Sequence, residues 1–230
     1  MPRRRLLRIL EPFSSRQDQP PSASPCIDRE ARLEDDSRCA VLNYEAALDA
    51  DRRYAPAYTN LGLVHYEQGR TNQALASLRT AVRLDPSNTV ALLNLGVVLY
   101  RAGKLAEAER RWREVIQLDA YHRDAHYFLG SLFFARGELD AAIDMYEKAL
   151  ARGGDTKVYM SLGAALLHRG EYERAVISFE EAIRLGDSQP TTYSLLAEAL
   201  TTLGKPAEAQ QVRDRAQALR ALHGSPTAAH

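Results

Sequence analysis

Residues 57–87 read AYTNLGLVHYEQGRTNQALASLRTAVRLDPS, and residues 91–121 read ALLNLGVVLYRAGKLAEAERRWREVIQLDAY. The second stretch begins 34 residues after the first and repeats its pattern in the same order, so that Leu61-Gly62 matches Leu95-Gly96. A fixed period of this length predicts an array of repeated supersecondary units rather than a domain with one central core.

The pattern continues through most of the chain. Within each unit, apolar residues recur at intervals of three and four, which predicts two helices joined by a short loop and therefore packed antiparallel. We expect an all-α solenoid of helix pairs. Full units are expected at 55–88, 89–122, 123–155, 156–189 and 190–223, after a partial unit at 28–54. Residues 1–27, rich in proline and serine, are expected to be a disordered or weakly ordered tail, and residues 224–230 a C-terminal tail.

Small and large residues follow one packing pattern along the units. On the first helix of each pair, one position holds Gly62, Gly96, Gly130, Gly163 or Ala197. On the second helix, one position holds Leu78, Trp112, Tyr146, Phe179 or Arg213. A small residue that faces a large one at helical spacing predicts close contact between the two helices. The loop within each pair carries a glycine, which we expect in the left-handed conformation that ends a helix.

These positions resemble the tetratricopeptide repeat (TPR), a helix-turn-helix unit of 34 residues. In the first full unit, the family pattern is matched by Tyr58, Leu61-Gly62, His65, Ala74, Leu78, Ala81 and Pro86. The later units match similarly, with departures at Ala197, Arg213 and Gly154. The resemblance implies a right-handed superhelix whose first helices line a concave groove, and a role in holding proteins or peptides.

The same resemblance places particular residues in that groove. We expect partner contacts from Asn60, Tyr66, Leu93, Asn94, Tyr100, Arg101, Tyr127, Phe134, Lys157 and Met160. An asparagine amide offers both a donor and an acceptor to a peptide backbone, and the aromatic rings offer stacking surfaces. An alternative interpretation is that asparagine is merely common before Leu-Gly in this family and that the aromatic rings pack within their own units. Some family members bind a carboxylate with a clamp of lysine, asparagine and arginine. That clamp is not matched here, because the residue four positions after Lys157 is Ser161.

Nothing in the sequence points to catalysis or to a cofactor. The chain has no phosphate-binding loop, nucleophile motif or metal-ligand cluster, and the spacing of His122 and His126 lacks the glutamate of a metalloprotease. His126 occupies a core position of its unit, so packing is its expected role. We therefore expect no enzyme activity, no cofactor, no metal and no small-molecule substrate.

Charge and composition restrict the kind of partner. Thirty basic and thirty acidic residues cancel, which argues against a nucleic-acid partner, and no stretch is apolar enough for a membrane span. The two cysteines, Cys26 and Cys39, are too few for a disulfide framework, so we expect them to be reduced. A cytoplasmic location is expected, with an organelle as the alternative because residues 1–10 are rich in arginine.

The leading hypothesis is a non-catalytic scaffold or adaptor that holds a protein or peptide in its concave groove. The alternative is an accessory or regulatory module of an enzyme or transcription complex, acting through its convex face or its N-terminal part. The sequence leaves the partner and the oligomeric state open.

Overall fold

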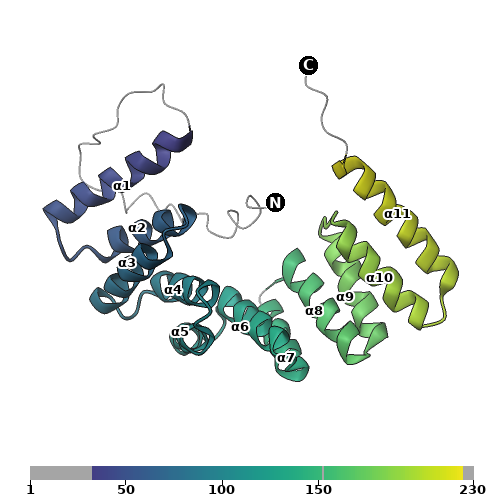
Figure 1. Ribbon diagram of the computed structural model, residues 1–230. Helices are drawn as coiled ribbons and strands as arrows, with labels where there is room; N and C mark the ends of the chain where they lie inside the picture. The colour runs from purple at the N-terminus through teal and green to yellow at the C-terminus, as the bar shows by residue number, and fades with distance from the viewer. Residues whose placement is uncertain (1–32, 152, 225–230) are drawn as a thin grey trace, which may run out of the picture. The chain divides into compact units, whose positions relative to one another are not determined.

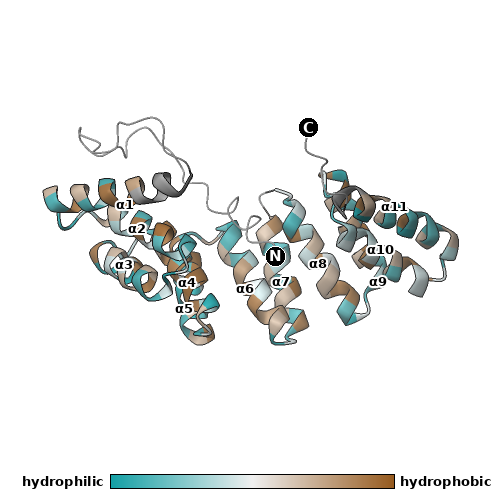
Figure 2. Ribbon diagram, turned by 45° about the horizontal axis from the view of Figure 1, so that its top comes forward, coloured by the Kyte–Doolittle hydropathy of each residue, from teal (hydrophilic) through white to brown (hydrophobic). Residues whose placement is uncertain are grey.

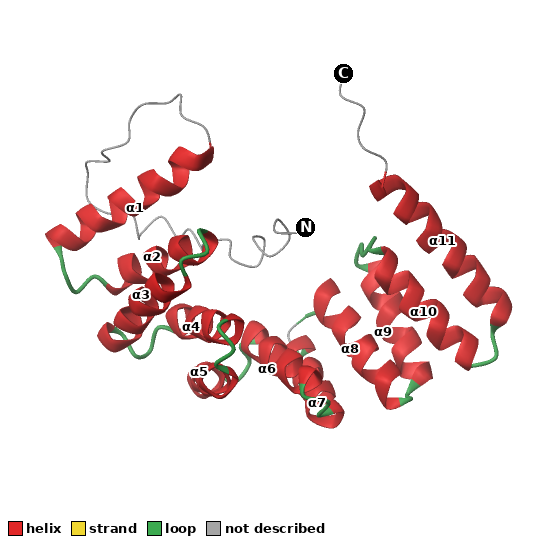
Figure 3. Ribbon diagram, viewed as in Figure 1, coloured by secondary structure: helices red, strands yellow, loops and turns green. Residues whose placement is uncertain are grey.

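The computed structural model describes residues 33–151 and 153–224, and in this part of the chain every regular element is an α-helix (Figures 1 and 3). The helices are α1 (Leu33–Ala50), α2 (Ala55–Glu67), α3 (Thr71–Leu84), α4 (Thr89–Arg101), α5 (Leu105–Leu118), α6 (Arg123–Ala135), α7 (Leu139–Leu150), α8 (Thr156–Arg169), α9 (Tyr172–Arg184), α10 (Pro190–Thr202) and α11 (Pro206–Gly224). The all-α prediction is confirmed.

The chain forms two compact units whose boundary falls between Asn94 and Leu95, inside α4. In unit 1, α2 packs against α3 and also touches α1. In unit 2, each helix from α5 to α11 packs against the next one along the chain, both within a repeat and across the boundary between repeats. The first helices α6, α8 and α10 also contact one another in chain order, as the helices of a repeat solenoid do.

Each predicted interval from 55–88 to 190–223 holds two of these helices. The expected partial unit at 28–54 holds α1, which begins at Leu33. The predicted tail at residues 1–27 lies outside the described residues, as does the C-terminal tail beyond Gly224. In Figure 2 the helices carry apolar and polar residues side by side, as expected of helices that bury one face.

The predicted contact between small and large residues is confirmed in four helix pairs. A Cβ atom added to Gly62 would lie 2.5 Å from Leu78 Cγ, and one added to Gly96 would lie 2.3 Å from Trp112 Nε1. At Gly130 and Gly163 the corresponding distances to Tyr146 and Phe179 are both 2.7 Å. These large side chains are each at most 2% exposed, so the glycines are required for the helices to approach.

The loops within the pairs also follow the sequence. Gly69, at the end of α2, has φ 75°, and the equivalent glycines of the next four pairs have φ values from 75° to 87°. Because this left-handed conformation is strained for other residues, glycine allows the chain to leave one helix and enter the next within a few residues.

One expectation is corrected. Cys39, on α1, is disulfide-bonded, so the prediction of reduced cysteines is wrong for this residue. The other cysteine of the sequence, Cys26, lies outside the described residues.

Candidate functional site

The predicted groove residues fall into the two units, and each group is described by itself. In unit 1, Asn60 and Tyr66 lie on α2 and are half-buried. Leu93, on α4, is also half-buried, whereas Asn94 is only 4% exposed. In unit 1, Asn60 therefore offers more of its amide to a partner than Asn94 does.

Unit 2 contains a continuous cluster of aromatic rings. The Tyr100 ring, on α4, lies 5.9 Å from the buried Trp112 ring of α5. Trp112 in turn stacks on Phe128 of α6, with 5.3 Å between ring centroids. Phe128 lies 5.5 Å from its neighbour Tyr127. The cluster joins the core of the second helices to side chains that are half-buried on the first helices.

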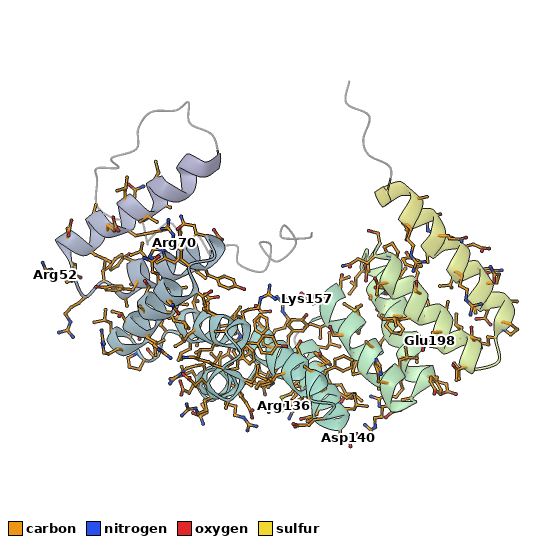
Figure 4. The ribbon with its side chains drawn as sticks, in the orientation of Figure 1. Arg52, Arg70, Arg136, Asp140, Lys157 and Glu198 are labelled. Carbon is orange, nitrogen blue, oxygen red and sulfur yellow. The ribbon has the colours of Figure 1, made fainter. Side chains whose placement is uncertain are left out.

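Tyr127 and Lys157 are brought together from adjacent first helices. Lys157 Nζ, on α8, lies 5.1 Å from the centroid of the Tyr127 ring on α6. Figure 4 labels Lys157 on α8, and its Nζ lies 3.6 Å from Asp124 Oδ1 of α6. Asp124 Oδ1 is buried and accepts no hydrogen bond from the described residues. Ring and carboxylate together hold the lysine in place, although it is 27% exposed and can still reach a ligand.

A buried hydroxyl lies beside this pair. Tyr146, on α7, has its ring centroid 6.0 Å from that of Tyr127 and donates a hydrogen bond to Ser131 Oγ at 3.3 Å. Burial raises the pKa of Tyr146 to about 12, although its hydrogen bonds with Ser131 and Ser161 act in the opposite direction. The phenol is therefore neutral at physiological pH. Its hydroxyl joins α7 to Ser131 of α6.

The remaining predicted residues of unit 2 lie outside this arrangement. The Phe134 ring, near the end of α6, meets His168 of α8 edge to face, with 5.4 Å between ring centroids. Met160 is half-buried on α8, and Arg101 is exposed at the end of α4. Of the six predicted residues in unit 2, the contacts thus join Tyr127 to Lys157 directly and to Tyr100 through Trp112 and Phe128.

Sequence reasoning missed Asp124, Ser131 and Ser161. All three lie on first helices, as the predicted groove residues do, so their polar character was a usable signal. Tyr146 was assigned to packing alone, which is correct for its ring but omits its hydroxyl.

Within residues 33–151 and 153–224, no group of three His, Cys, Asp or Glu side chains could hold a metal ion. His126 is buried, and its Nε2 lies 2.9 Å from the carbonyl oxygen of Ala120, in accord with its predicted packing role. The described part of the chain also has no helix long and apolar enough to cross a membrane.

Comparison with known families identifies the repeat. The tetratricopeptide repeat profile matches residues 34–89, 59–122, 93–156 and 145–190, and a second profile of the same description matches residues 190–215. The chain therefore belongs to the tetratricopeptide repeat family.

Solved structures with the same fold include several repeat proteins. MamA is 25% identical over 71% of this chain and 96% of its own, with a TM-score of 0.65. PilF of Pseudomonas aeruginosa is 25% identical over 75% of this chain and 78% of its own, with a TM-score of 0.66. YrrB, described as a TPR protein with an unusual peptide-binding site, is 18% identical over 78% of this chain and 93% of its own, with a TM-score of 0.65. A search of curated proteins gave no match.

Proposed function

We propose that this protein is a non-catalytic adaptor that holds an extended segment of a partner protein on the first-helix face of unit 2. The observation that carries the proposal is the arrangement on α6 and α8, where Lys157 Nζ lies 5.1 Å from the centroid of the Tyr127 ring, which itself lies 6.0 Å from the ring of Tyr146. YrrB, which has the same fold and is described as binding peptides, supports the class of function.

The surface suits an extended peptide for three reasons. The Tyr127 ring provides an apolar, polarisable face for a side chain of the partner. Ser161 carries a hydroxyl group that can hydrogen-bond to a peptide backbone, whereas Ser131 already donates to the carbonyl oxygen of Tyr127 and accepts from Tyr146. Lys157 supplies a positive charge that is already oriented by Asp124, which lowers the entropy lost when a ligand binds.

In unit 1, Asn60 and Tyr66 would contribute separate contacts to the same partner. Asn60 is the better candidate of the two asparagines because Asn94 is buried. We include Tyr100, Arg101, Phe134 and Met160 of unit 2 and Leu93 of unit 1 as further contacts in this proposal.

The experiment is a pull-down from cell extract with the wild-type protein and paired variants. Tyr127→Ala and Lys157→Ala should each lose the partner. Their matched controls are Tyr121→Ala, which removes a tyrosine that is 55% exposed in a loop, and Lys148→Ala, which removes a lysine paired with Asp144 on α7. Partner capture that survives Tyr127→Ala and Lys157→Ala but fails with either control would contradict the proposal.

A second function is favoured by a specific surface on the second helices of unit 2. A hollow of about 410 Å³ between α9 and α11 has an apolar floor that includes Ile183, Leu196 and Val212. Ile177, also on α9 but outside the lining of the hollow, is 60% exposed. An accessory module of a larger complex would use such a face, and Val212→Asp should then release the partner while Tyr127→Ala does not.

The compartment is a separate question. The sequence favours the cytoplasm, where thiols are kept reduced, whereas the disulfide at Cys39 favours oxidising surroundings. Cell fractionation followed by alkylation of free thiols separates the two: a cytosolic protein with an alkylated Cys39 supports the cytoplasmic proposal.

A further inference from the structure

The last helix pair departs from the packing pattern at both of its key positions. Where the other pairs have glycine, α10 has Ala197, which is 1% exposed. Where the other pairs have a buried large side chain, α11 has Arg213, which is exposed. The two exceptions in the sequence thus fall on facing positions of one pair, and the arginine is not part of the core.

Two arginines of α11 reach across to hydroxyl groups of α10. Arg213 Nη2 donates to Thr201 Oγ1 at 2.6 Å, and Arg220 Nη2 donates to Ser194 Oγ at 2.8 Å. Each hydroxyl in turn donates to a carbonyl oxygen of its own helix. The acceptors are therefore neutral, so both guanidinium groups are oriented while their charge stays uncompensated.

Several other arginines of unit 2 are paired with acids. Arg136 pairs with Glu109 at 2.8 Å, and Arg184 pairs with Glu181 at 2.6 Å. Within the described residues, neither Arg213 nor Arg220 has a carboxylate oxygen within 4.0 Å. Each keeps most of its five N–H donors available for a ligand.

The two arginines line one hollow of about 350 Å³ along the contact between α10 and α11. Its wall also includes Gln217 and Asp214, and the Asp214 carboxylate already accepts a hydrogen bond from Gln210 at 2.8 Å. Arg213 and Arg220 are seven residues apart on one helix, which places their backbones roughly 10 Å apart along its axis. Both guanidinium groups can therefore serve one ligand that carries two separated anionic groups.

We propose that this hollow binds an acidic segment of a partner protein, with Arg213 and Arg220 each holding one carboxylate through a pair of parallel hydrogen bonds. A planar guanidinium group matches a carboxylate in this way, and the match is better than for a lysine. The site is independent of the surface around Tyr127 and Lys157.

Charge favours an acidic protein segment over a nucleic acid. A nucleic acid needs a continuous positive track along its phosphates, whereas the whole chain has no net charge. Glu198 is exposed on α10, three residues before Thr201 and four after Ser194 (Figure 4). A negative charge so close in the sequence opposes a ligand as densely charged as a nucleic acid.

The test uses fluorescence anisotropy with the full-length protein at low salt. The probe is a short labelled peptide that alternates Glu and Ser, and the control peptide has Gln in place of Glu. We expect binding of the Glu peptide alone, a loss of about tenfold in affinity for Arg213→Gln and for Arg220→Gln, and a gain for Glu198→Gln. Arg215→Gln is the matched control, because Arg215 lies on the same helix but lines the other hollow.

Three results would overturn the proposal: equal affinity for the Gln peptide, an equal loss with Arg215→Gln, or tighter binding of a single-stranded oligonucleotide than of the Glu peptide. Circular dichroism verifies that each variant keeps its helices. Arg213→Lys adds a measurement that does not depend on folding, since it keeps the charge but loses the paired hydrogen bonds, and its affinity should lie between those of wild type and Arg213→Gln.

Discussion

The pair α6/α7 and the pair α10/α11 use the same two sequence positions for different purposes. In α6/α7, Gly130 makes room for Tyr146, whose ring is buried while its hydroxyl serves the first-helix face. In α10/α11, Ala197 fills that room itself, and Arg213 turns outward to Thr201. The same repeat position thus holds a buried ring in one pair and an exposed, hydrogen-bonding side chain in the other.

The largest expected effect comes from removing the large residue of each pair. Tyr146→Ala should lower the free energy of unfolding by about 3–5 kcal/mol, because it leaves a cavity beside Gly130. Arg213→Ala, at the equivalent position, should change it by less than about 0.5 kcal/mol because the side chain is exposed. Urea unfolding followed by circular dichroism measures both values. Similar losses for the two variants would break the comparison.

The next effect comes from exchanging the small residues. Gly130→Ala should cost about 1–3 kcal/mol, since the added methyl group would lie 2.7 Å from the Tyr146 ring. Ala197→Gly should cost only about 1 kcal/mol, the loss of helix propensity, because no large ring faces it. The same unfolding assay applies. A stabilising Gly130→Ala would show that Tyr146 can move aside and that the glycine is not required for packing.

The comparison also shows what sequence could and could not provide. The period, the helix pairs and the buried positions were predictable because each depends on residues that recur in every unit, such as Gly96 with Trp112. The Tyr127–Lys157 contact was not predictable, since it joins two successive repeats of unit 2 through residue types that do not recur in the other repeats. Likewise, the sequence shows that Arg213 replaces the large apolar residue of the pattern. It does not show that the guanidinium group donates to Thr201, because that contact depends on a hydroxyl of the neighbouring helix.

The smallest expected effect concerns charge. Arg136 is paired with the carboxylate of Glu109, whereas Arg213 donates to the neutral hydroxyl of Thr201. Glu109 accepts from both Arg136 and Arg113 at 2.8 Å. Burial acts to raise the pKa of Glu109, but the hydrogen bonds and charges of these two arginines hold it below its ordinary value of 4.5. Because the pKa is lower in the folded state, the carboxylate stabilises the fold above about pH 4.5, and this contribution is lost as the pH falls through the lowered value.

Glu109→Gln should therefore cost about 0.5–1 kcal/mol at pH 7, the range of a partly exposed ion pair. The difference between wild type and variant should shrink to nothing at acidic pH, as measured by urea unfolding at a series of pH values. A constant Glu109→Gln difference across the series would mean that Glu109 acts through packing and not through its charge.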